Sequence, residues 1–134
     1  MSERVFLDTS VLYRYLAEDD PPRACAAATL IESERTLVVS GVVILETIYA
    51  LRTTATRQNP ELALGLISFL SRANVELVDA DRGHVVASLR WTMESSARRI
   101  PDAILAASAS QAGCDWIATF DEAFASPNVP SRLL

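Results

Sequence analysis

Lysine is absent from this 134-residue sequence, and several other residue types that carry chemistry are scarce. All twelve basic residues are arginine, and there are four glycines. Phosphoaspartate receivers and haloacid-type phosphatases need a lysine near their acidic pocket, and the phosphatases also need a second acid where this chain has Ser10. The glycines spell neither GxGxxG nor a Walker A loop. These absences exclude several acidic and nucleotide-binding sites of α/β proteins.

Cysteine and histidine are also too few to build a metal site. Cys25 and Cys114 lack the CxxC spacing of such a site, and His84 is the only histidine. We expect both cysteines to be small buried hydrophobic residues. A Ser–His–Asp triad would have to use His84, which falls inside a predicted helix and is better explained as a surface or core residue.

The sequence contains no apolar run long enough to span a membrane and no basic, apolar leader pattern. We therefore expect a cytoplasmic protein, folded as one domain over residues 1–134. Half of the residues are hydrophobic, which is typical of a globular chain. A net charge of −5 counts weakly against a nucleic-acid partner, which usually requires a basic patch, although a bound metal ion can supply local positive charge.

Short apolar segments alternate with longer helical patterns along the whole chain. Strands are predicted at residues 4–8, 36–40, 75–78 and 116–119, and helices at 9–17, 24–34 (with Pro21 and Pro22 before it), 42–56, 60–72, 81–95 and 101–111. The tail from Asp121 is predicted to be irregular, and a short strand near Val129 is left open. This order predicts an α/β fold, a three-layer α/β/α sandwich with a central, mostly parallel sheet. Ligands of such sheets bind beyond the carboxyl ends of the strands.

Three acids stand where strands end or helices begin. Asp8 follows the first strand and can be explained as a helix N-cap. Asp102 opens an alanine-rich helix, where a negative charge is favourable. Asp121 follows the last predicted strand and can be explained as a turn residue. Each position alone is weak support for a functional role.

Glu46 is harder to explain structurally, because it lies within the apolar helix GVVILETIYAL. On a helical period its neighbours are Val42, Val43, Tyr49 and Ala50. A carboxylate on such a face is unfavourable unless it is paired or bound to a cation. A salt bridge to Arg52 or Arg14 is the structural alternative.

At one edge of a parallel sheet these four acids can converge. Two carboxylates about 4 Å apart repel each other by roughly 4 kcal/mol at an effective dielectric of 20. A bound proton or a cation must relieve this repulsion. An all-oxygen cluster suits Mg²⁺ or Mn²⁺, and the natural chemistry is phosphodiester hydrolysis.

Four segments, FLDTSVLYRYL, ILETIYAL, IPDAILAASA and IATFDEAF, resemble in order the four motifs of PIN domains, especially those of VapC-type toxins of toxin–antitoxin pairs. The resemblance covers nearly the whole chain. It implies a PIN-like sandwich, dependence on Mg²⁺ or Mn²⁺, and endoribonuclease activity. It also implies a homodimer that a cognate antitoxin protein inhibits.

Carried onto this chain, the resemblance identifies the catalytic and metal-binding acids as Asp8, Glu46, Asp102 and Asp121. Thr9 and Thr119 resemble hydroxyl residues that position the acids, and an ordinary turn or cap role is nearly as well supported. Candidate RNA phosphate contacts are Arg14, Arg52, Arg98 and Arg99, although each can equally be a solvated surface residue. A catalytically inactive RNA- or protein-binding module and a nuclease directed at DNA remain the alternatives.

Overall fold

A computed structural model describes residues 2–54 and 57–134 of the chain, and its centre is a five-stranded parallel sheet. The strands are β1 (Arg4–Leu7), β2 (Thr36–Ser40), β3 (Val75–Val78), β4 (Trp116–Thr119) and β5 (Ser131–Leu133). Their spatial order is β3-β2-β1-β4-β5, and every neighbouring pair is parallel. The predicted α/β class is therefore confirmed.

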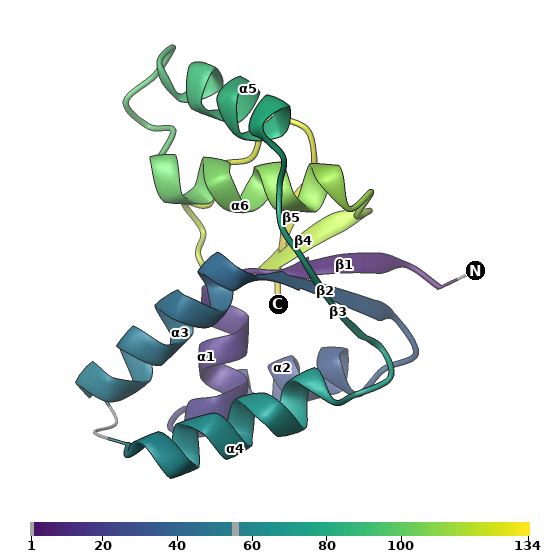
Figure 1. The fold of residues 1–134 in the computed structure, drawn as a ribbon, viewed down its shortest axis with the longest axis vertical. Helices are drawn as coiled ribbons and strands as arrows, with labels where there is room; N and C mark the ends of the chain where they lie inside the picture. The colour runs from purple at the N-terminus through teal and green to yellow at the C-terminus, as the bar shows by residue number, and fades with distance from the viewer. Residues whose placement is uncertain (1, 55–56) are drawn as a thin grey trace.

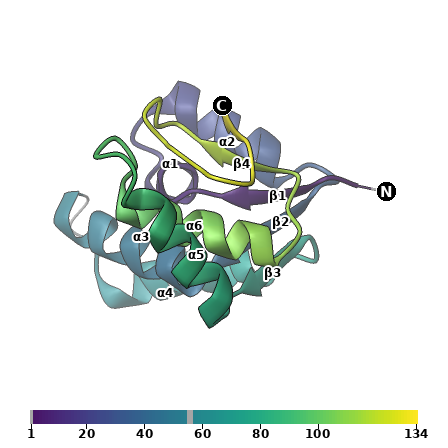
Figure 2. The ribbon, with the colours of Figure 1, turned by 90° about the horizontal axis from the view of Figure 1, so that it is seen from above.

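Helices cover both faces of this sheet. They are α1 (Thr9–Ala17), α2 (Pro21–Ile31), α3 (Gly41–Thr54), α4 (Asn59–Leu70), α5 (Arg82–Thr92) and α6 (Ile100–Gln111). Figure 1 shows α5 and α6 on one side of the sheet and α1 to α4 on the other. Seen from above, α5 again lies beside α6 (Figure 2), in keeping with the contacts between these two helices.

Local chemistry explains where several helices begin and end. The side chains of Asp8, Asp20 and Asp81 cap α1, α2 and α5 by accepting hydrogen bonds from backbone N–H groups of the first turn. Proline occupies the first turn of α2, α4 and α6, where a missing N–H does no harm. After α6 the chain turns through Gly113 at φ 65°, a left-handed conformation that glycine adopts without strain.

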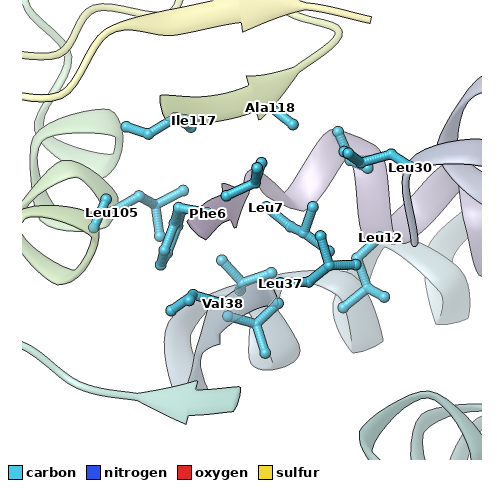
Figure 3. Close-up of a cluster of buried hydrophobic side chains, with 14 of the residues drawn as sticks. Phe6, Leu7, Leu12, Leu30, Leu37, Val38, Leu105, Ile117 and Ala118 are labelled. Carbon is cyan, nitrogen blue, oxygen red and sulfur yellow. The ribbon is translucent and has the colours of Figure 1, made fainter. Parts of the chain in front are cut away.

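The core fills both faces of the central strand β1. Figure 3 shows Phe6 on the side of Leu105 from α6, whereas Leu7 lies on the side of Leu12 and Leu30 from α1 and α2. All five side chains are buried. Successive residues of a strand point to opposite faces, so a continuous apolar run is what a strand covered on both sides requires.

Most of the predicted helices and strands are confirmed to within a few residues. The tail, for which a short strand was left open, does form one. Strand β5 forms slightly beyond the position considered near Val129 and pairs with β4, from Ile117↔Ser131 to Thr119↔Leu133. The predicted helix 42–56 begins one residue earlier, and its last two residues lie outside the described part of the chain. Within residues 2–54 and 57–134, no helix has the length and apolar character needed to cross a bilayer.

The expectation that both cysteines are buried is wrong for Cys25. Its side chain is exposed, because it lies on the outer side of α2 while Ala27, Leu30 and Ile31 face the core. Cys114 is partly buried, and burial raises the pKa of its thiol to about 11. His84 is a surface residue whose ring bonds Asp81, as a residue of the first turn of α5.

We predict that replacing Phe6 with alanine lowers the free energy of unfolding by about 3–5 kcal/mol, because the ring is fully buried and leaves a cavity. Urea unfolding monitored by circular dichroism measures this change. Met93→Ala is the control, since Met93 is 83 % exposed and its loss should change stability by no more than about 0.5 kcal/mol. Equal stabilities of the two variants would contradict this account of the core.

Candidate active site

The candidate site lies where the strand order of the sheet reverses. From β1 the chain builds outward to β2 and β3, and it then crosses to the other side of β1 to form β4 and β5. The carboxyl ends of β1 and β4 lie side by side, with Leu7 paired to Ala118. Open α/β sheets bind ligands at such switch points, beyond the carboxyl ends of the strands.

Asp8 is fixed at this point by a dense set of hydrogen bonds. Its backbone N–H donates to the carbonyl of Ala118 at 3.0 Å, which extends the pairing of β1 and β4 by one residue. Its Oδ1 accepts from the N–H of Thr9 at 2.8 Å. Its Oδ2 accepts from the hydroxyls of Ser10 and Thr119 at 2.9 and 2.7 Å. The carboxylate is only 7 % exposed, so these donors replace the water it has lost.

Asp102 and Asp121 are joined by one cation, the guanidinium of Arg99. Arg99 Nε and Nη2 each lie 3.1 Å from Asp102 Oδ2, and Nη2 lies 2.5 Å from Asp121 Oδ2. Asp102 is buried in the first turn of α6, and Asp121 is half-buried in the loop after β4. Arg99 is the residue before α6 and therefore reaches both acids from the same corner of the site.

The pKa values of Asp102 and Asp121 are shifted in opposite directions by this environment. Burial raises the pKa of Asp102, and the nearby charges of Asp8 and Asp121 raise it further, against the opposing effect of Arg99. The hydrogen bond from Arg99 lowers the pKa of Asp121, and the backbone N–H of Ala123 contributes in the same direction. The charges of Asp8 and Asp121 both act on Asp102, which indicates that the three acids lie near one another.

Glu46 approaches the same corner through Thr9. The Thr9 hydroxyl donates to Glu46 Oε1 at 2.8 Å, which connects α3 to the residue that follows Asp8. No salt bridge joins Glu46 to Arg52 or Arg14 in the described part of the chain. The premise of a buried apolar face is also wrong, because Tyr49 is 63 % exposed and Val42 is 39 % exposed. Glu46 is partly exposed at the border of that face.

The candidate arginines separate into one site residue and three surface residues. Arg14 pairs with Asp19, and Arg52 bonds the side chain of Asn59. Arg98 pairs with Glu94 and lies over the Trp91 ring at 4.4 Å. Of the four, only Arg99 contacts the acids of the site.

Sequence reasoning missed Ser10 as a residue of the site. Its hydroxyl donates to Asp8 and accepts from the backbone N–H of Phe120 at 3.0 Å, so it ties the start of α1 to the loop after β4. Thr119 does the same from the other side, accepting from the N–H of Asp121 at 2.9 Å. The Asp-Thr-Ser sequence at a helix start is the signal that points to Ser10, because first-turn hydroxyls can reach back to the cap residue.

The donor chemistry of the site suits a hard divalent cation. All the side-chain ligands on offer are carboxylate or hydroxyl oxygens, which Mg²⁺ and Mn²⁺ prefer. Burial and repulsion at Asp102 add a need for positive charge beyond what Arg99 supplies. In residues 2–54 and 57–134, no three His, Cys, Asp or Glu side chains are grouped closely enough to hold a metal ion as they stand.

Comparison with known proteins identifies the protein family of this chain. The family model described as the PIN domain matches residues 5–129, which include all four acids. The chain belongs to the PIN domain family. A search of curated proteins finds no sequence match.

Solved structures confirm that the PIN domain fold is shared. VapC20 of Mycobacterium tuberculosis, titled a Sarcin-Ricin loop cleaving toxin, is 18 % identical, with a TM-score of 0.72 over 90 % of this chain and 92 % of that one. VapBC2 of Rickettsia felis, bound to a DNA fragment from its promoter, is 18 % identical, with a TM-score of 0.70 over 97 % and 98 %. PAE2754 of Pyrobaculum aerophilum is 20 % identical, with a TM-score of 0.62 over 96 % and 83 %.

We predict that Thr119→Val lowers the free energy of unfolding by about 1–3 kcal/mol. The variant keeps the shape of the side chain but leaves the N–H of Asp121 without its partner and removes a donor from Asp8. Thr119→Ser retains the hydroxyl and is the control. Chemical denaturation of the three proteins measures the difference, and a Thr119→Val variant as stable as the wild type would rule out this structural role.

We predict that Asp102→Asn makes the metal-free protein more stable at neutral pH. A folded-state pKa raised above the ordinary value of 3.8 means that the folded protein binds this proton more tightly than the unfolded chain. The carboxylate therefore destabilises the fold increasingly as pH rises through the raised pKa. Thermal melting with chelator from pH 4 to 8 should show the advantage of the variant shrinking toward acid pH. An advantage of wild type at neutral pH would contradict the prediction.

Proposed function

We propose that this PIN domain protein is a divalent-metal-dependent endoribonuclease that serves as the toxin of a type II toxin–antitoxin pair. One observation carries the proposal in a chain of this family: Asp8 and Asp121 follow the neighbouring strands β1 and β4, and their charges act on Asp102 at the start of α6. Thr9 links Glu46 to the same corner. Two buried acids, Asp8 and Asp102, near the half-buried Asp121 are an unfavourable arrangement that a nuclease metal site would explain.

In this proposal Asp8, Asp102 and Asp121 hold Mg²⁺ or Mn²⁺, with Glu46 completing the group. The bound ion would supply charge neutralisation at the scissile phosphate and lower the pKa of an attacking water. Thr119 and Ser10 fix the rotation of the Asp8 carboxylate, and Thr9 fixes Glu46.

The partners of the protein are part of the same proposal. The similarity to VapC20, a Sarcin-Ricin loop cleaving toxin, supports RNA as the substrate, and the similarity to the VapBC2 complex supports a cognate antitoxin as the inhibitor. The exposed apolar side chains of Val42, Leu45 and Tyr49 on α3 support a second copy of the chain or a partner protein covering that helix. Arg99 is the arginine best placed to meet a substrate phosphate.

The test is an RNA cleavage assay with protein freed of any partner. Structured and single-stranded RNAs, with single-stranded DNA alongside, are incubated with Mn²⁺, Mg²⁺ or EDTA. We expect metal-dependent RNA cleavage by the wild type, leaving 5′-phosphate and 3′-hydroxyl ends, and none by Asp102→Asn, because that variant loses an acid of the site. Glu61→Gln is the matched control, since it removes an exposed carboxylate on α4.

Other outcomes separate the alternatives. Cleavage that persists in EDTA or in Asp102→Asn, or products with 2′,3′-cyclic ends, would contradict the proposed chemistry. Preferential cleavage of DNA would identify a DNA-directed nuclease. If no nucleic acid is cut and Mn²⁺ does not raise the melting temperature, the chain is a binding module whose acids are structural.

A further inference from the structure

Arg99 occupies the position between the acids that a bound cation would share. Its guanidinium contacts Asp102 Oδ2 through both Nε and Nη2, and Nη2 also contacts Asp121 Oδ2. One side chain therefore bridges an acid from the start of α6 and an acid from the loop after β4. No other salt bridge to either acid exists in the described part of the chain.

The hydrogen bonds around Asp121 leave little room for a second cation. Its Oδ1 accepts from the backbone N–H of Ala123 at 2.9 Å, and its Oδ2 accepts from Arg99. The backbone contact is part of the loop, whereas the arginine contact is made by a flexible side chain. A divalent ion placed against Asp102 and Asp121 would also repel the guanidinium at short range. The contacts of Arg99 with the two acids are consequently the ones that must break when the ion binds.

Nothing in the fold prevents Arg99 from moving. Its side chain is 46 % exposed, so it can turn into solvent. It stands before α6 and makes no side-chain cap for that helix, so its departure breaks no helical hydrogen bond. The neighbouring Arg98 is held differently, by Glu94 and by the Trp91 ring, and does not contact the acids.

We propose that Arg99 is an internal counter-cation that closes the site in the metal-free protein and is displaced from Asp102 and Asp121 when a divalent ion binds. This inference rests on the proposed metal-dependent function. It adds that the Arg99 guanidinium and the divalent ion compete for Asp102 and Asp121. In the free protein Arg99 holds the loop after β4 against α6. Metal binding must break both contacts, which lowers the apparent affinity for the ion and releases the guanidinium beside the site.

The competition is measured by isothermal titration calorimetry of Mn²⁺ into the purified full chain. Wild type, Arg99→Gln and Arg98→Gln are compared, the last being a control that removes the same charge one residue away. We expect Arg99→Gln to bind Mn²⁺ roughly three- to tenfold more tightly than wild type, the range expected for losing a partly exposed ion pair. Arg98→Gln should bind like wild type.

The direct readout is the Nε–Hε signal of Arg99 in a nitrogen–proton spectrum, assigned by its absence from Arg99→Gln. We expect this signal to shift during a titration with diamagnetic Mg²⁺, while the Arg98 signal stays in place. Circular dichroism of the variants establishes that each is folded before titration.

The outcomes distinguish failure of this inference from failure of the proposed function. Equal or weaker Mn²⁺ binding by Arg99→Gln, with binding by the wild type intact, overturns the role of Arg99 and leaves the metal site standing. An equal gain in Mn²⁺ affinity in Arg99→Gln and Arg98→Gln would be a general effect of the lost positive charge. That result also overturns the role of Arg99. Absence of Mn²⁺ binding in all three proteins overturns both proposals.

Discussion

The pairing of β1 with β4 places Asp8 beside the chain that leads to Asp121, and the rest of the site depends on how the charges of these acids are satisfied. Asp8 cannot move away from this position, because its own N–H continues the pairing with Ala118. Its buried carboxylate is stabilised by hydroxyl and N–H donors, two of which come from Ser10 and Thr119. Since Thr119 ends β4, the hydroxyl that donates to Asp8 also accepts from the N–H of Asp121 and orders the chain leading to it. Structure and site geometry are therefore coupled at the strand ends.

Arg99 does not stabilise the ionised forms of Asp102 and Asp121 equally. Arg99 contacts both, yet the pKa of Asp102 is raised and that of Asp121 is lowered. The difference follows from burial, because Asp102 has little access to water and faces two other carboxylates, whereas Asp121 is half exposed. An arrangement that separates neighbouring acids in this way is common where chemistry is performed and unfavourable where only stability counts.

The sequence was sufficient to predict the helices and strands, and insufficient to predict the contacts of the candidate acids. Strand β1 was predictable because its apolar run is covered on both faces, and the caps at Asp8 and Asp81 were predictable from local hydrogen bonding. The choice between Arg98 and Arg99 was not, because it depends on how the chain enters α6 and where the loop after β4 passes. The environment of Glu46 was not predictable either: its partner is Thr9 rather than an arginine, and a hydrophobic pattern does not reveal that Tyr49 faces solvent.

The alanine-rich sequence of α6 explains how Asp102 comes close enough to Asp8 to feel its charge. Helix α6 contacts β2 and β4 on one side and α5 on the other, so it is enclosed. Apart from Leu105, its buried apolar positions are small: Ala103, Ala106, Ala107 and Ala109. Short side chains let a helix axis approach a sheet, and larger ones would hold it away because protein interiors are close-packed. The small residues that follow Asp102 thus set the depth of the acid in the site, although none of them carries chemistry itself.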